Sequence, residues 1–134
     1  MLTCAERFAK KLDSKDLHYR TATNSSGDDV IIFPYQRRDT TCFFSGEDGQ
    51  YLSMYTCFES VPEDKFLEAL IACNELNAQY KWVTFYIDKD KDIIVHDDAI
   101  LNVETAAEEA FELLLRMLDI TSDAKPVLMK AIYA

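Results

Sequence analysis

Apolar positions recur with a helical period in three parts of the chain. Residues 2–12 place five of them on one face of a helix: Leu2, Ala5, Phe8, Ala9 and Leu12. Similar patterns predict helices from Ser60 to about Gln79 and from about Glu104 to Leu118. The buried face expected for the last helix holds Ala107, Ala110, Phe111, Leu114 and Leu118. Each segment opens with Ser or Thr followed three residues later by Glu, which predicts three capping boxes: Thr3 with Glu6, Ser60 with Glu63, and Thr105 with Glu108.

Between the first two helices the period changes to that of strands. Residues 50–58 alternate two sets of side chains, and Asp48-Gly49 before them is a strong hairpin signal. Pro34 interrupts the apolar run at 30–35, which suggests an edge strand or a bulge. We expect three or four antiparallel strands here, the first of them over Leu17–Thr23. A second hairpin, with strands at 82–87 and 93–96, follows the second helix.

Pro126 predicts a break after the third helix and a short last helix over Val127–Tyr133, because proline lacks the N–H that a helix interior requires. Together the elements predict a single domain over residues 1–134. Its class is α+β, with an antiparallel sheet of about five strands, flanking helices and the order α-β-β-β-α-β-β-α.

Composition and charge limit the partners. The 134 residues are 49% hydrophobic, enough for a packed core, and the formal charge of −10 disfavours nucleic acid and anionic membrane surfaces. No apolar run reaches the length of a membrane span. The four cysteines have no metal-ligand spacing and no secretory signal is visible, so we expect free thiols and a cytoplasmic location.

No residue cluster predicts catalysis, a metal or a cofactor. The acidic segment Asp88–Asp92 resembles the start of an EF-hand loop, but Ile93 and Ala99 occupy the positions that require glycine and glutamate. His96, Asp97 and Asp98 are consecutive, and neighbouring residues on a strand point to opposite faces. The three glycines form no phosphate-binding motif. We therefore expect a protein that is not an enzyme.

The second and third helices are apolar over more than one stripe, which predicts a surface for a protein partner or a second copy of the chain. The residues that widen these faces are Phe66, Leu67, Leu70, Ile71, Leu113, Leu115 and Met117. Asn74 and Asn77 lie near the end of the second helix although Asn is a weak helix former. They either bond to backbone groups where the helix meets the next strand or contact a ligand or partner.

One pattern runs from the end of the second helix to the third: Asn74-x-x-Asn77, the strand at 82–88, the charged turn, the strand at 93–96 and the helix entered through Ile100-Leu101. This pattern resembles the YbjN family of proposed bacterial sensory transduction regulators. The resemblance covers nearly the whole chain and implies the fold of type III secretion chaperones, which act as small acidic dimers. It also implies a partner-binding module with no catalytic residues, in which Asn74 and Asn77 have structural value.

Three functions remain open. The first is a protein-binding or regulatory module that forms a homodimer, chaperone-like or part of bacterial signal transduction. The second is a type III secretion chaperone in the strict sense. The third is a small-molecule or metal-binding protein that uses the acidic rim of the second hairpin.

Overall fold

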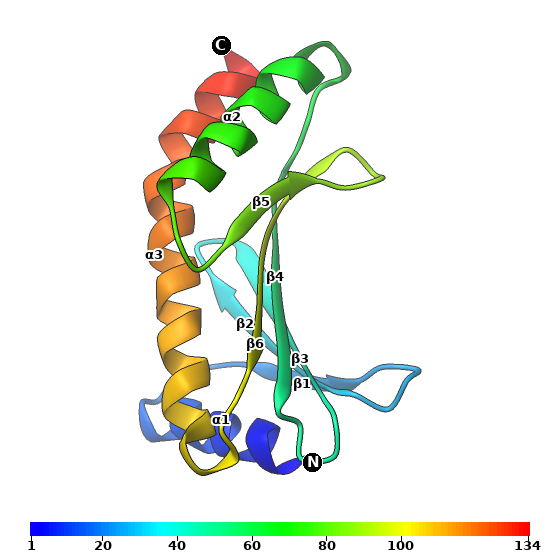
Figure 1. Ribbon diagram of the computed structural model, residues 1–134, viewed down its shortest axis with the longest axis vertical. Helices are drawn as coiled ribbons and strands as arrows, with labels where there is room; N and C mark the ends of the chain where they lie inside the picture. The colour runs from blue at the N-terminus through cyan, green and yellow to red at the C-terminus, as the bar shows by residue number, and fades with distance from the viewer.

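The computed structural model describes all residues, 1–134, as three α-helices and one sheet (Figure 1). The helices are α1 (Thr3–Ser14), α2 (Phe66–Gln79) and α3 (Ala106–Tyr133). The strands are β1 (Arg20–Thr23), β2 (Asp29–Tyr35), β3 (Arg38–Ser45), β4 (Tyr51–Ser60), β5 (Thr84–Ile87) and β6 (Asp92–Ile100). Two 3-10 turns, η1 (Glu63–Lys65) and η2 (Val103–Thr105), precede α2 and α3.

All six strands are antiparallel to their neighbours, in the order β1-β2-β3-β4-β6-β5. The α+β class, the antiparallel sheet and the flanking helices are confirmed, and the sheet has one strand more than the expected five. The segment between α1 and α2 forms four strands, the larger of the two numbers expected there, and the first of them, β1, begins at Arg20 rather than at the predicted Leu17. Pro34 lies beyond the last residue that β1 pairs, at an open edge of β2.

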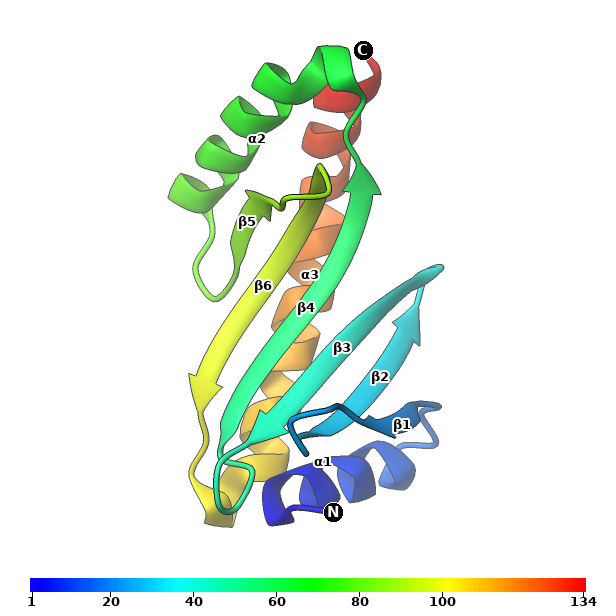
Figure 2. The same ribbon diagram turned by 90° about the vertical axis from the view of Figure 1, so that its right-hand side faces the viewer.

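The helices cover only one face of the sheet. Figure 2 shows the sheet in front of α3, with α1 near one end of α3 and α2 near the other. The inward side chains of β4 are Leu52, Met54, Thr56 and Phe58, all buried against the helices. The outward set of the same strand, Tyr51, Ser53, Tyr55 and Cys57, faces the side that no helix covers. The alternation predicted for residues 50–58 is therefore present.

One hydrophobic core contains residues from all three helices and from β2 to β6. Its only buried polar side chains are Thr40 and Thr56, paired across β3 and β4 with 2.8 Å between their hydroxyl oxygens. The predicted Asp48-Gly49 hairpin joins β3 to β4. A Cβ at Gly49 would lie 3.0 Å from Leu2 Cβ, and the residue has a φ of +75°, so glycine suits both the turn and the contact with the N-terminal segment.

The predicted break at Pro126 is wrong, because α3 continues through it to Tyr133. A proline inside a helix leaves the carbonyl of residue i−4 without its donor. That residue is Ser122, which is exposed, as is Pro126, so water can hydrate the free carbonyl. Although α3 is 28 residues long, neither it nor any other helix has an apolar stretch that could cross a membrane.

None of the three predicted capping boxes forms a side-chain cap. The hydroxyl of Ser60 donates instead to Asp92 of β6, which lies opposite it in the sheet. Before α3, the side chain of Asn102 accepts the Glu104 N–H, and the Glu109 carboxylate accepts from the Asn102 N–H and the Thr105 hydroxyl. These polar side chains therefore form other hydrogen bonds than the capping boxes that the sequence spacing predicted.

Candidate partner-binding surfaces

The helix α2 carries an apolar stripe on the side away from the core. Its buried residues are Ala69, Ala72, Cys73 and Leu76. On the opposite side Leu67, Leu70 and Ile71 are 64%, 42% and 51% exposed. A helix that is apolar on all sides is usually buried on all sides. The α2 stripe (Leu67, Leu70 and Ile71) is therefore the clearest unpartnered surface among the predicted residues.

The other four predicted surface residues have different environments. Phe66 is half-buried, with the Lys91 ammonium 4.5 Å from its ring centroid. Leu113 is half-buried against the core, and Leu115 is 41% exposed on α3. Met117 is fully buried, with its Sδ 3.6 Å from Thr56 Oγ1, so it is not available to a partner.

Met117 faces inward because the buried stripe of α3 differs from the one the sequence suggested. The stripe runs through Ala106, Ala110, Leu114, Met117, Ile120, Ala124, Leu128 and Ile132, spaced by three or four residues. Ala107, Phe111 and Leu118, which the pattern placed in the core, are only half-buried. Leu and Met flank both stripes, so the sequence alone left the rotation of α3 ambiguous.

The two asparagines near the end of α2 differ in their contacts. The Asn77 side chain accepts from the Phe85 N–H at 2.7 Å and donates to the Phe85 carbonyl at 2.9 Å. It satisfies backbone groups of β5, the structural alternative considered for the pair. Asn74 is exposed on the helix surface and forms no hydrogen bond within the chain.

The acidic segment Asp88–Asp92 is the turn between β5 and β6. The carboxylate of Asp88 accepts the N–H groups of Asp90 and Asp92, both at 3.0 Å. Lys91 has a φ of +63° and completes the reversal of the chain. No three His, Cys, Asp or Glu side chains in the molecule lie close enough together to hold a metal ion.

His96, Asp97 and Asp98 do not converge. His96 and Asp98 lie on the uncovered face, with His96 Nε2 2.9 Å from Asp98 Oδ1, whereas Asp97 alternates to the other face and its Oδ2 is buried without a partner. Burial raises the pKa of Asp97 to about 6. Burial also opposes ionisation of Asp98, but the hydrogen bond from Ser53 and the neighbouring His96 outweigh it, so its pKa is lowered.

An aromatic cluster on the uncovered face was missed in the sequence. The Tyr55 ring stacks on His96, with 4.4 Å between centroids, and Tyr86 meets His96 edge-on at 6.1 Å. Phe43 contacts Tyr55 edge-on at 5.8 Å. The aromatic residues in the outward set of β4 were a signal for it, since an outward face is expected to be polar.

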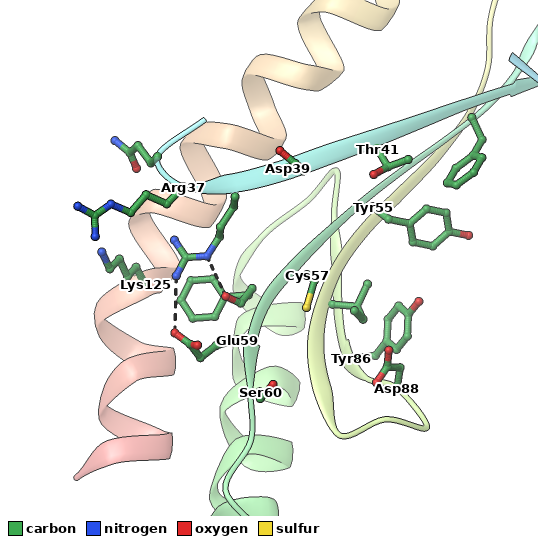
Figure 3. Close-up of a pocket in the computed structure, with 15 residues that line it drawn as sticks. Arg37, Asp39, Thr41, Tyr55, Cys57, Glu59, Ser60, Tyr86, Asp88 and Lys125 are labelled. Carbon is green, nitrogen blue, oxygen red and sulfur yellow. Dashed lines mark hydrogen bonds and ion pairs between the residues drawn. The ribbon is translucent and has the colours of Figure 1, made fainter. Parts of the chain in front are cut away.

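This face also holds a pocket of about 840 Å³ between the β2–β3 turn and the β5–β6 hairpin (Figure 3). Tyr55 and Tyr86 lie at one end of it and Arg37 and Lys125 at the other. Cys57 lines the pocket, but burial and the nearby Asp92 and Asp88 carboxylates raise its thiol pKa, which disfavours a nucleophilic thiolate. The lining of the pocket contains no pair of nucleophile and base.

Solved structures show the same architecture. The chain is similar to one in the crystal structure of the Yersinia pestis type III secretion chaperone SycH in complex with a stable fragment of YscM2: the TM-score is 0.58 and the identity 11%, over 90% of this chain and 98% of that one. A chain in the crystal structure of the ExsC-ExsE complex is also similar, with a TM-score of 0.50 and an identity of 12%, over 96% of this chain and 97% of that one. At these identities the likeness establishes the fold, which confirms the expected secretion-chaperone-like architecture.

The family of the chain is established from its sequence, separately from the likeness in fold. No curated protein sequence is significantly similar to the chain. The family model of YbjN, described as "Putative bacterial sensory transduction regulator", matches residues 5–125, which include every strand and most of α3. The chain belongs to the YbjN family, as the Asn74-x-x-Asn77 helix and the hairpin after it suggested.

Proposed function

We propose that the protein is a non-enzymatic, cytoplasmic protein-binding module that acts as a homodimer, with the α2 stripe as its dimer face. The single observation that carries the proposal is the exposure of Leu67, Leu70 and Ile71 on a helix whose other side is already buried. Burial of such side chains in a second copy is favourable by about 25 cal/mol for each Å² of apolar surface.

The surroundings of the α2 stripe favour a second copy as its occupant. A groove of about 500 Å³ between α2 and the C-terminal part of α3 adjoins Ile71, and its walls include Val127 and Ala131. The charged residues along this groove are Lys65, Lys130, Glu68 and Glu75, two of each sign. The contact between identical faces therefore brings no net charge together, although the chain as a whole carries −10.

Asn74 lies one helical turn beyond Leu70 and Ile71, exposed and without an intrachain partner. A carboxamide both donates and accepts, so two copies of it can pair across a two-fold axis. We include Asn74 in the dimer face for this reason. Participation of Leu113 and Leu115 stays a prediction, and Met117 is left out because it is buried.

The role in protein binding is supported by the fold. SycH was crystallised with a fragment of YscM2, and ExsC with ExsE. A role as a type III secretion chaperone in the strict sense, or in sensory transduction as the family description says, would be a specialised form of the same activity. Co-purification from the native cell distinguishes these two, because only the first enriches a secreted protein.

Light scattering after size exclusion tests the dimer. We expect twice the chain mass of 15.4 kDa at micromolar concentration. The double variant Leu70→Lys with Ile71→Lys should run as a monomer with an unchanged circular dichroism spectrum, because both side chains already contact solvent. Ile100→Lys is the control, since Ile100 is 79% exposed at the end of β6, away from α2. A monomeric wild-type chain, or equal mass for both variants, would refute the dimer.

A further inference from the structure

We infer that the pocket on the uncovered sheet face binds a segment of a partner protein in which a carboxylate side chain lies next to an aromatic or aliphatic one. The inference rests on the proposed protein-binding function and names the class of partner. It concerns a surface separate from the α2 stripe, on a different face of the molecule.

Three cationic side chains line this pocket: Arg37 from the β2–β3 turn, Arg38 from the first position of β3, and Lys125 from α3. Figure 3 shows Arg37 and Lys125 on the same side of the pocket although 88 positions separate them in the sequence. Both are exposed and neither forms an ion pair within the chain. In a chain of net charge −10, unpaired cations gathered from two elements indicate a site for an anion.

The carboxylates that line the same pocket are already occupied. Asp39 lies 2.8 Å from the Arg20 guanidinium, and Glu59 lies 3.9 Å from that of Arg38. The carboxylate of Asp88 accepts the backbone N–H groups of its own turn. Asp88 keeps its negative charge, whereas Arg37 and Lys125 have no carboxylate partner within the chain. The positive charge open to a ligand therefore lies at the end of the pocket that Arg37 and Lys125 line.

Arg38 adds a fixed donor to the lining of the pocket. Its guanidinium lies 4.2 Å from the Phe58 ring centroid, and its Nε donates to the Phe58 carbonyl at 2.8 Å. These contacts hold the planar group in place and leave further N–H groups for an incoming oxygen. A guanidinium fork is well suited to a carboxylate, and partial burial strengthens the interaction.

The other end of the pocket is mainly aromatic and aliphatic, with Asp88 beside Tyr86 (Figure 3). Tyr55 and Tyr86 lie there (Figure 3), and Phe43 and Ile94 also contribute to the lining. Rigid aromatic walls favour an apolar side chain of a protein partner. A nucleic acid would bring many phosphates towards a chain of net charge −10, so a protein segment with one or a few carboxylates fits better.

A random 12-residue peptide library displayed on phage, selected against the full chain, tests the inference. We expect enriched peptides to combine Asp or Glu with an aromatic or aliphatic residue. A synthetic peptide of the enriched sequence should bind more weakly as salt increases. The double variant Arg37→Glu with Lys125→Glu should weaken it by about tenfold or more, and Tyr86→Ala should also weaken it.

Lys10→Glu with Lys81→Glu is the matched control, because it makes the same change in net charge away from the pocket. It should leave the affinity within about twofold of wild type, since long-range charge effects are screened by salt. No enrichment, enriched peptides without acidic residues, or equal weakening by both double variants would overturn the inference.

The solution mass of the variants, measured by light scattering, distinguishes failure of this inference from failure of the dimer proposal. Arg37→Glu with Lys125→Glu should remain dimeric, and Leu70→Lys with Ile71→Lys should still bind the peptide. If the pocket variant became monomeric, a second copy would occupy the pocket and the inference would be wrong. If the wild-type chain were monomeric but bound the peptide as expected, only the dimer proposal would fail.

Discussion

The Asn77 side chain pairs with the backbone of Phe85 as a neighbouring strand would. Its amide oxygen accepts the Phe85 N–H and its amide nitrogen donates to the Phe85 carbonyl, at 2.7 and 2.9 Å. β5 pairs with β6 on one side only, so these groups lie on the open edge of the sheet. Asn77 thus fixes α2 to β5 and blocks part of an edge that could otherwise pair with another chain.

Replacement of Asn77 by alanine should therefore destabilise the fold. We expect a loss of about 1–3 kcal/mol, because two partly buried backbone groups would lose their partner. Urea denaturation followed by circular dichroism measures the change. Asn74→Ala is the control, as its side chain has no partner in the isolated chain, and it should alter the stability of a monomeric variant by less than about 0.5 kcal/mol. Equal losses would show that the pairing contributes little.

Replacement of Pro126 by alanine should stabilise the protein. The new N–H can donate to the carbonyl of Ser122 within α3, and alanine is the better helix former. We expect a gain of about 1–3 kcal/mol and a higher melting temperature, measured by thermal unfolding. No gain would contradict a continuous helix through this position.

The cost of truncating Met117, compared with that of truncating Leu115, tests how α3 is rotated against the sheet. Both lie on α3, two residues apart, but Met117 is buried and Leu115 is 41% exposed. Met117→Ala should cost about 2–5 kcal/mol because it leaves a cavity under β4, whereas Leu115→Ala should cost less than about 1 kcal/mol. Chemical denaturation of both variants checks the rotation of α3, and the reverse order would contradict it.

Asp97 should make the folding stability depend on pH. Burial raises its pKa from 3.8 to about 6, so between these values the folded state binds more protons than the unfolded state. The contribution of Asp97 therefore falls as the pH rises through this range. Asp97→Asn should be more stable than the wild type at pH 7.5, by about 1 kcal/mol after allowance for partial exposure. The difference should disappear below about pH 4.

Asp98→Asn is the control for the sign of this effect. The pKa of Asp98 is lowered in the folded state, so its ionised form contributes stability that is lost as the pH falls. Its replacement should destabilise the protein at pH 7.5. Urea midpoints measured from pH 4 to 8 would contradict the assignment if both variants changed stability in the same direction.

The order of elements was largely predictable because most of them bury one face. The alternation over 50–58 and the stripe over 2–12 identified β4 and α1, and their inward residues are the predicted ones. The strand expected over Leu17–Thr23 is also present as β1, although it begins at Arg20 and all four of its residues are exposed. Pro126 misled the prediction because tertiary packing overrides the local cost of proline: Ala124 before it and Leu128 after it are both buried against the core, which keeps α3 continuous.

The α2 stripe was also predictable, since too many apolar residues for one face must leave some outside. Leu67, Leu70 and Ile71 are exposed, as a partner surface requires, whereas Met117 is buried. When two faces of a helix carry similar apolar residues, two rotations of the helix about its axis would bury similar amounts of apolar surface. Packing of α3 against Thr56 and its neighbours decides between them.

By itself the sequence determined the α+β architecture, the acidic surface and the apolar excess of α2, because each depends on the period or the count of residue types. Only the tertiary structure decided that Asn77 pairs with Phe85, that Met117 is buried and that Arg37 and Lys125 share one pocket. These relationships join residues on different elements. Their distances depend on how the elements pack, which no local pattern of the chain records.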